Sequence, residues 1–383
     1  MEKLFDNKNQ CCGCTACMNV CPKGAISMVA DSSGFEYPQI DKTLCIDCGL
    51  CKSVCAFQNG YKKGEAVKTV FAAKNNSSEI RANSSSGGVF SQLAKHFIDN
   101  GGVVYGAAFD NDLVVRHICV DESKEFKKLR SSKYVQSKLD FTFKEIKQKL
   151  DKGQSVLFSG TGCQVGALKG YLKKDYDNLL TVDIVCHGTP SPKLFADYKA
   201  FMEKKYGSKA VAFNFRAKKI YGETQDMAIS FENGKIYSEF PAIDVYKSLF
   251  SRNLSLRPSC FECKYTNINR PSDITLGDFW GIDKCIPNFN DKKGVTLVIP
   301  NSEKGRKLFE SVKGSFAVKE TAIENALQPN LKAPTKKPDG YEAFQNDYCT
   351  NGFDYIANKY AKTSALTVAK ARINNTVKKL LKK

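Results

Sequence analysis

The chain has 383 residues, 42% of them hydrophobic, which suits a globular protein of about two or three domains. Its net charge of +18 admits an anionic lipid surface or an acidic protein as partner, but without a compact basic motif we predict no nucleic-acid binding. No apolar run reaches the roughly 20 residues of a membrane span, and the start shows no signal-peptide core, so a cytoplasmic protein is predicted.

Cysteine spacing dominates the first 60 residues. One run reads Cys11-x2-Cys14-x2-Cys17-x3-Cys21-Pro22, and a second reads Cys45-x2-Cys48-x2-Cys51-x3-Cys55. In this pattern three cysteines bind one [4Fe-4S] cluster and the fourth binds the other. We therefore predict two clusters, with the ligands Cys11, Cys14, Cys17 and Cys55 for the first and Cys45, Cys48, Cys51 and Cys21 for the second. The segment resembles a bacterial two-cluster ferredoxin and predicts electron transfer.

Two further observations support this interpretation. Clustered thiols in a reducing cytosol bind metal more often than they pair as disulfides. Paired zinc sites would leave the two x3 spacings unexplained, and the chain has only 3 histidines. Cys12 is an extra thiol inside the first loop, and we interpret it as a non-ligand.

After a polar linker near residues 58–68, short β-rich runs alternate with helical patterns. Strands are expected at 69–74, 101–110, 155–160, 179–185, 210–215 and 294–300, and helices at 86–99, 140–151, 163–173, 191–206 and 302–313. Residues 227–240 predict a hairpin that turns at Asn233-Gly234. The alternation predicts an α/β fold, with a mixed sheet and flanking helices, preceded by a small bacterial-type ferredoxin α+β domain.

The predicted domains are a two-cluster ferredoxin domain at 1–60, a cofactor-binding α/β domain at 61–350 and a basic C-terminal helix at 351–383. From Ala357 to Lys383 there are 8 Lys or Arg and no acidic residue. Such a helix is either solvated or makes a peripheral contact with an anionic membrane.

Two strand-to-helix turns rich in small residues favour a phosphate-bearing cofactor. "SSSGGVF" places Ser86, Gly87 and Gly88 before a helix, and "SGTGC" places Gly160, Thr161 and Gly162 before another. Neither turn has a full dinucleotide or Walker pattern, so NAD and ATP are not indicated. In "RSSKYV", Ser131, Lys133 and Tyr134 suit a cofactor's phosphate or ring, although an exposed loop has the same composition.

Four later cysteines supply enough thiolates for one more cluster. Cys163 opens a helix, Cys186 follows a strand, and Cys260 and Cys263 form a C-x2-C pair. From spacing alone they are either a third [4Fe-4S] site or buried inert thiols.

At this point a family resemblance can be stated. The ferredoxin repeats, followed by "SSSGGVFSQLA", "LRSSKYVQS", "SGTGCQVGAL", "DIVCHGTPSP", "CFECKY" and "SDITLGDFWG", look like the beta-subunit family of coenzyme F-420 hydrogenases and dehydrogenases. The resemblance implies a flavin, FAD or FMN, lined by Ser86, Gly87, Gly88, Ser131, Lys133, Tyr134, Gly160, Thr161 and Gly162. It also implies that Cys163, Cys186, Cys260 and Cys263 bind a third [4Fe-4S] cluster.

The expected function is that of an iron–sulfur flavoprotein oxidoreductase. In it, [4Fe-4S] clusters exchange single electrons with a flavin, which exchanges a hydride with a small-molecule substrate. Relatives with two ferredoxin motifs resemble polysaccharide-cluster proteins, so a sugar-linked substrate is one expectation. The alternative is an electron-transfer subunit that serves a separate catalytic partner. A ferredoxin or similar protein is the expected redox partner. The catalytic residue is unknown from sequence, with His187 and Asp278 as weak candidates.

Overall fold

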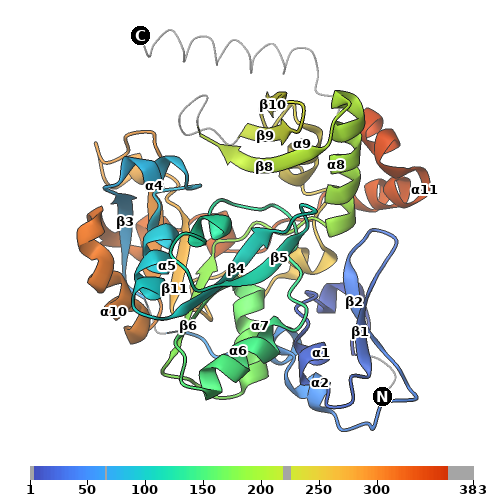
Figure 1. Ribbon diagram of the computed structural model, residues 1–383, viewed down its shortest axis with the longest axis horizontal. Coiled ribbons are helices and arrows are strands. Elements are labelled where there is room, and N and C mark those ends of the chain that lie inside the picture. Colours follow the sequence, from blue (N-terminus) through green and yellow to red (C-terminus); the bar gives the residue numbers. More distant parts are fainter. Residues whose placement is uncertain (1–3, 65–66, 219–225, 361–383) are drawn as a thin grey trace.

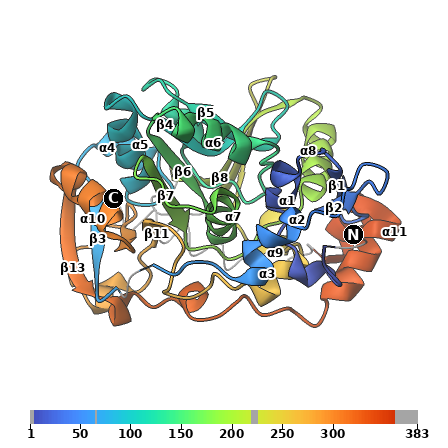
Figure 2. The same cartoon turned by 90° about the horizontal axis from the view of Figure 1, so that it is seen from below.

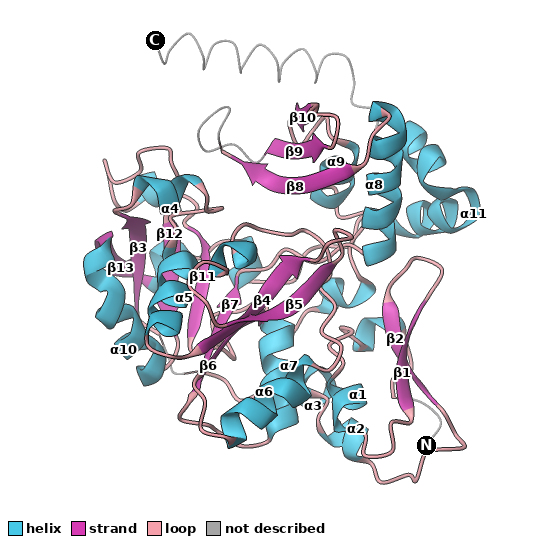
Figure 3. Cartoon of the chain, in the orientation of Figure 1, coloured by secondary structure: helices cyan, strands magenta, loops and turns pink. Residues whose placement is uncertain are grey.

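The computed structural model describes residues 4–64, 67–218 and 226–360 (Figure 1). Within these residues, eight strands form one mixed sheet (Figure 3). In spatial order they are β13 (Phe316–Ala322), β3 (Thr69–Asn75), β12 (Thr296–Pro300), β11 (Ile274–Asp278), β7 (Leu179–Ile184), β6 (Val156–Thr161), β4 (Val103–Phe109) and β5 (Val115–Val120).

The strand directions place several loops at one edge of this sheet. β11, β7, β6 and β4 are parallel to one another, and β3 shares their direction because β12 pairs antiparallel with both β3 and β11. The carboxyl ends of β3, β11, β7 and β6 therefore lie along the same edge, which we call the carboxyl edge. In α/β sheets this is the edge where ligands bind.

Helices cover both faces of the sheet, because side chains of successive strand residues point to opposite faces. On β6, Leu157 packs into a core with α5 (Val89–Asp99) and α10 (Glu303–Val312). Its neighbours Val156 and Phe158 pack into another core with α6 (Thr142–Asp151) and α7 (Gly162–Leu172). A short helix, α4 (Ser78–Ala82), lies in the loop between β3 and α5.

The ferredoxin segment packs against the α6 and α7 side of the sheet (Figure 2). Its elements are α1 (Ala16–Val20), β1 (Ile26–Ala30), β2 (Glu36–Ile40), α2 (Leu50–Ser53) and α3 (Ala56–Asn59), with β1 and β2 antiparallel. Ala16 and Val54 are each 1% exposed and belong to the same core as α6 and α7. The segment therefore shares a hydrophobic core with the main sheet.

A second, three-stranded sheet has the order β10 (Ile236–Glu239), β9 (Asp226–Phe231) and β8 (Ala210–Ala217). It packs with α8 (Pro192–Tyr206), α9 (Val245–Ser251) and α11 (Tyr341–Tyr360) around a core rich in aromatic rings. β9 and β10 form the predicted hairpin at Asn233-Gly234, and Gly234 has a positive φ of 80°. Of the predicted basic C-terminal helix at 351–383, residues 351–360 belong to α11, and 361–383 lie outside the described residues.

The predicted fold class is confirmed, with local differences. The strand expected at 210–215 is β8, and it pairs with the hairpin instead of the main sheet. The helix expected from residue 86 begins at Val89, because Gly88 at its N-cap has a φ of 85°. β5, β11 and β13 were not predicted. No helix of residues 4–64, 67–218 or 226–360 is both long and apolar enough to span a membrane.

Gly305 gives a test of how tightly α10 packs on the sheet. A Cβ at this helical position would overlap the backbone carbonyl of Asp273, whereas a Cβ at Gly314 would meet nothing. Helix propensity alone would make Gly305→Ala stabilising by about 1 kcal/mol, but overpacking against backbone costs about 1–3 kcal/mol or more. We expect Gly305→Ala to lower the free energy of unfolding in chemical denaturation and Gly314→Ala to leave it nearly unchanged. A more stable Gly305→Ala protein would contradict the packing.

Candidate functional site

The ferredoxin cysteines gather into two groups. One cavity, of about 220 Å³, is lined by the first cysteine group, which we define as Cys11, Cys14, Cys17 and Cys55. Cys12 and Cys51 also line this cavity. A smaller cavity is lined by the second cysteine group, which we define as Cys21, Cys45, Cys48 and Cys51. These are the two ligand sets that the spacing predicts. Cys21 and Cys55 each reach the group formed by the other repeat.

The thiols of each group stand around open space. Within residues 4–64, 67–218 and 226–360, no three His, Cys, Asp or Glu side chains are arranged to hold a single metal ion. Separated cysteines around a shared cavity fit a multi-iron cluster, because the cluster occupies the space between its ligands. In the second group Cys48 is exposed, whereas the cysteines of the first group are all at least half-buried. The second group is thus the one nearest to solvent.

The third cysteine group consists of Cys163, Cys186, Cys260 and Cys263. Cys163 lies in the first turn of α7 after β6, and Cys186 follows β7, so both lie at the carboxyl edge. Cys260 lies in the 3-10 helix Pro258–Glu262, and Cys263 is its C-cap. Burial raises the pKa of Cys186 well above its usual value, and the neighbouring Cys260, Cys163 and Cys263 raise it further. Cys186 is therefore within electrostatic reach of the other three thiols.

The loop that carries Cys263 is held against the carboxyl edge by a buried ion pair. Arg270 and Asp183 on β7 are each at most 1% exposed in their side chains, with 2.9 Å between Nη2 and Oδ2. Arg270 also donates to the carbonyl of Ile184 at 2.9 Å. Tyr265 of this loop stacks on Tyr61 of the segment after the ferredoxin module, with 4.5 Å between ring centroids. The loop therefore ties the end of β7 to the ferredoxin side of the molecule.

The glycine turn at Gly160–Gly162 lies beside this loop. A Cβ at Gly162 would be 2.9 Å from Cβ of Tyr265 and 3.0 Å from Nη2 of Arg270. Thr161 and Gln164 form a capping box at the start of α7. Close packing against Tyr265 thus accounts for Gly162, and Thr161 serves as a helix cap.

Three other predicted flavin residues, Ser86, Gly87 and Gly88, lie farther along the edge, in the loop that follows β3. The Gly87 N–H donates to Oγ1 of Thr296 at 2.8 Å, and the Ser86 hydroxyl donates to the carbonyl of Val295 at 2.9 Å. A Cβ at Gly87 would overlap the Ala73 carbonyl. Three strands, β12, β11 and β7, lie between β3 and β6. At the usual strand spacing of about 4.8 Å, the distance from β3 to β6 is about 19 Å. One phosphate cannot occupy both glycine turns.

The loop 131–138 joins these two regions. At one end the Ser132 N–H donates to Oγ of Ser85 at 2.8 Å, next to Ser86. At the other end Gln136 donates to the carbonyl of Cys12 at 3.0 Å, and Lys138 pairs with Glu36 of β2 at 2.7 Å. Burial lowers the pKa of Lys133 to about 7, and its Nζ donates to the carbonyls of Lys128 and Arg130. Lys133 thus braces the loop.

A cavity of about 310 Å³ opens at the carboxyl edge, between the end of β11 and the second sheet. Arg216 of β8 pairs with Asp278 of β11 at 2.7 Å, and the nearby Trp280 is 55% exposed. Burial raises the pKa of Tyr134, while the nearby charge of Arg216 lowers it. Arg216, Asp278 and Trp280 line this cavity, together with Asp283, Asn290 and Val295. Tyr134 does not line it, and its ring stacks on Phe250 with 4.7 Å between the ring centroids.

The two catalytic candidates have different surroundings. Asp278 lines the cavity at the carboxyl edge. His187 does not line it, and its ring is held by Oδ1 of Asn253 at 2.7 Å from Nε2. Sequence reasoning also missed Arg216, because a lone basic residue at the end of a strand carries no spacing signal.

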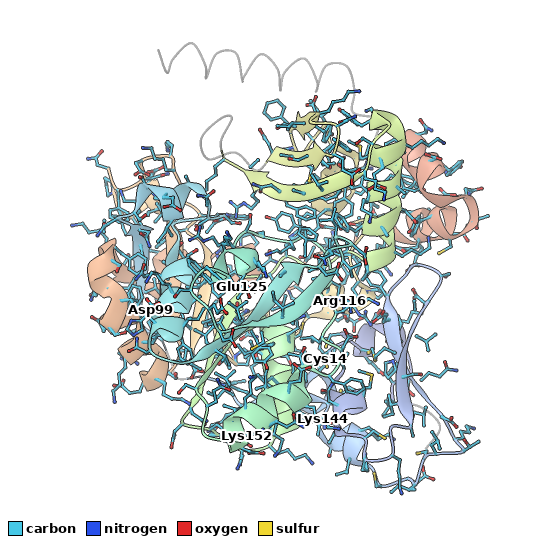
Figure 4. All side chains as sticks on the ribbon, in the orientation of Figure 1. Cys14, Asp99, Arg116, Glu125, Lys144 and Lys152 are labelled. Carbon is cyan, nitrogen blue, oxygen red and sulfur yellow. The ribbon has the colours of Figure 1, made fainter. Side chains whose placement is uncertain are left out.

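Cys12 occupies the junction between the first and third cysteine groups. It is 8% exposed, and its hydrophobic cluster includes Tyr265, with Cys14, Cys163 and Cys263 packed against it. Hydrogen bonding with Cys14 and Cys163 raises the pKa of Cys12 well above its usual value. This favours the protonated thiol, whose single S–H can donate to one of the two neighbours at a time. The same bond from Cys12 lowers the pKa of Cys163 to about 7, against the effect of burial. Figure 4 labels Cys14 where the ferredoxin ribbon meets the α6 and α7 side of the sheet.

Comparisons with known proteins find family models that match two parts of this chain. Residues 153–326 match the family model for the C terminus of the beta subunit of coenzyme F420 hydrogenase/dehydrogenase, and residues 10–59 match a 4Fe-4S dicluster domain. These two matches confirm the resemblance drawn from the motifs. A solved structure of the F420-reducing [NiFe] hydrogenase complex from Methanosarcina barkeri aligns with 15% identity and a TM-score of 0.45, over 78% of this chain and 93% of that chain. The comparison with curated proteins finds no match.

Substitution of Cys21 and of Cys55, the last cysteine of each repeat, tests which cysteines bind which cluster. We expect Cys21→Ser to damage the cluster of the second group and Cys55→Ser that of the first, because each thiol lines the cavity of the other repeat. Reduced-state EPR spectra of anaerobically purified variants distinguish the two losses. Cys12→Ser is the control and keeps both clusters. The reverse assignment of the losses would show that the ligand sets are wrong.

Proposed function

We propose that the chain, whose residues 153–326 match the family model for the C terminus of the coenzyme F420 hydrogenase/dehydrogenase beta subunit, is an iron–sulfur flavoprotein oxidoreductase. Its dicluster ferredoxin domain makes it an iron–sulfur electron-transfer protein. The finer proposal adds a third [4Fe-4S] cluster, a flavin and a small-molecule substrate. The observation that carries it is the junction at Cys12, where the first and third cysteine groups share one buried contact.

The third cysteine group has the chemistry that a [4Fe-4S] cluster needs. It offers four thiols from three separate segments, and no disulfide consumes them. Burial raises the pKa of Cys260 to about 11 and that of Cys263 to about 12, so without a metal these side chains are neutral thiols, and a bound cluster would displace their protons. Thiols that crowd together in a reducing environment bind metal more often than they stay free.

The three groups form a series from the surface to the carboxyl edge. The second group is the outermost, since Cys48 is exposed and the nearby Leu44 and Ile46 are 49% and 57% exposed. These apolar side chains offer a contact for the redox partner, a ferredoxin or similar carrier. The first group lies next, and Cys12 links it to the third. Electrons would pass along this series in either direction.

The cavity at the carboxyl edge supports the flavin and the substrate. Its volume of about 310 Å³ is at the lower end of the range for ligand pockets, about 300–1,000 Å³. A bound flavin would supply the conversion between single electrons and a hydride. Trp280 offers an exposed ring face, and the ion pair of Arg216 and Asp278 offers charged groups at the cavity wall. Asp283 and Asn290 give the polar lining that a sugar-linked substrate would require.

Iron content tests the third cluster. The intact chain is expected to hold about twelve irons, four for each cubane, and Cys260→Ser about eight. Cys285→Ser is the matched control, because Cys285 lies outside all three groups and should leave the count unchanged. Iron and protein are measured on anaerobically reconstituted samples. A wild-type count of about eight that Cys260→Ser does not reduce would reject the third cluster.

Denaturation of the anaerobically purified chain tests the flavin. We expect the released cofactor to be FAD or FMN, identified by chromatography, and Trp280→Ala to weaken its retention because the exposed ring is lost from the cavity. Leu44→Ala serves as the control, since this exposed side chain lies on the ferredoxin segment. A protein that holds iron but no flavin after reconstitution would leave the electron-transfer subunit as the function.

A further inference from the structure

Arg257 is a buried cation without a carboxylate partner in residues 4–64, 67–218 and 226–360. The residue is 1% exposed, and it donates to the carbonyls of Cys11 and Glu36 and to Oε1 of Gln136, each at 2.9 Å. Its guanidinium also lies 4.3 Å from the centroid of the Tyr37 ring. Neutral acceptors satisfy its hydrogen bonds but leave its charge uncompensated. Burial of such a charge costs several kcal/mol.

Arg270 shows the contrast within the same chain. It is equally buried, at 1% exposed, but it pairs with the carboxylate of Asp183 at 2.9 Å. The charge of Arg270 is thus neutralised locally, and the charge of Arg257 must be balanced by something else. The nearest groups that could supply a negative charge are the cysteines, as the thiolate ligands of a bound cluster.

The side chain of Arg257 lies between two cysteine groups. Its Nη2 is 3.9 Å from Sγ of Cys11, a member of the first group. Its own carbonyl accepts from the Cys260 N–H at 2.9 Å, so it directly precedes the segment that carries two cysteines of the third group. The guanidinium contacts the first group directly, and the main chain of the same residue is bonded to the segment of the third group. One fixed charge therefore acts on thiols of both groups.

The loop of the first group is shaped around this guanidinium. Gly13 has a φ of 68°, and a Cβ there would be 2.8 Å from Nη1 of Arg257 and from Nε2 of Gln136. Only glycine fits this position, because both the backbone conformation and the neighbouring side chains exclude a Cβ. The backbone at Cys11–Gly13 thus holds the guanidinium in one place.

We propose that Arg257 is a positioning residue whose fixed positive charge raises the reduction potentials of the first and third clusters together. A cluster gains one negative charge on reduction, and a buried cation nearby stabilises that state. The second group does not share the effect, because none of its cysteines contacts Arg257 in the described structure. The part of the proposal that concerns the third cluster rests on the proposed function, whereas the part that concerns the first cluster does not.

The test uses the full chain, reconstituted anaerobically and titrated with EPR detection of each cluster. We expect Arg257→Gln to lower the reduction potentials of the first and third clusters by about 59 mV, which is about tenfold in the equilibrium constant of a one-electron couple. The potential of the second cluster should stay unchanged. Arg257→Lys retains the positive charge, so its reduction potentials should stay close to those of the wild-type protein. Arg306→Gln, at an exposed site on α10, is the control.

A second variant keeps the test decisive if Arg257→Gln does not incorporate iron. In Gln136→Glu, a carboxylate oxygen replaces the amide oxygen that accepts from Arg257, and its negative charge neutralises the guanidinium. The reduction potentials of the first and third clusters should therefore fall. The proposal would be overturned if the reduction potentials of all three clusters shifted equally. It would also be overturned if no potential shifted in an iron-containing Arg257→Gln or Gln136→Glu protein. If iron counts show no third cluster, the proposed function fails, but the shift of the first cluster still decides the role of Arg257.

Discussion

The contact between the loop Cys11–Thr15 and the start of α7 is the interaction on which the rest of the site depends. Cys12 lies in this contact with hydrogen bonds to Cys14 on one side and Cys163 on the other. Ala16 and Val54 anchor it by burial in the core beneath α6 and α7. Because the ferredoxin segment and the sheet share this core, the first and third groups are held at one separation. A rigid junction of this kind suits electron transfer between fixed centres.

Glycines allow the close approaches at this junction. A Cβ at Gly170 would be 2.8 Å from the Val54 carbonyl, and a Cβ at Gly166 would be 2.6 Å from the Tyr265 hydroxyl. Gly162 and Gly13 are restricted in the same way by Tyr265 and Arg257. The glycines along α7 therefore let the helix pack closely against the ferredoxin module and the loop that carries Cys263. The same residue type before a helix would also suit a phosphate, so its sequence signal has two physical explanations.

The ferredoxin module was predictable from sequence because its information is local. Four cysteines within eleven positions define their own geometry, and each cavity is lined by one predicted set, with Cys51 lining both cavities and Cys12 the first. The third group was predictable only in part. Its members lie in three segments, and the convergence depends on parallel β6 and β7 and on the Arg270–Asp183 pair, neither of which leaves a spacing pattern.

The remaining differences also have physical reasons. β11 is a five-residue strand in a Gly- and Asp-containing segment, and β13 is an edge strand with an exposed polar face, so neither carries a strong hydrophobic pattern. Arg216 and Arg257 were missed because a single arginine becomes informative only when its burial and partners are known. Ser86 and Gly87 were assigned to a flavin on motif grounds, yet their polar groups bond to β12 and the loop before it.

The positions of iron atoms test this account most directly. Crystals of the anaerobically reconstituted chain, measured at the iron absorption edge, should show three separate anomalous peaks. One should lie within each cysteine group, with Cys12 between the peaks of the first and third groups. Two peaks confined to the ferredoxin segment, with free thiols at Cys163, Cys186, Cys260 and Cys263, would contradict it.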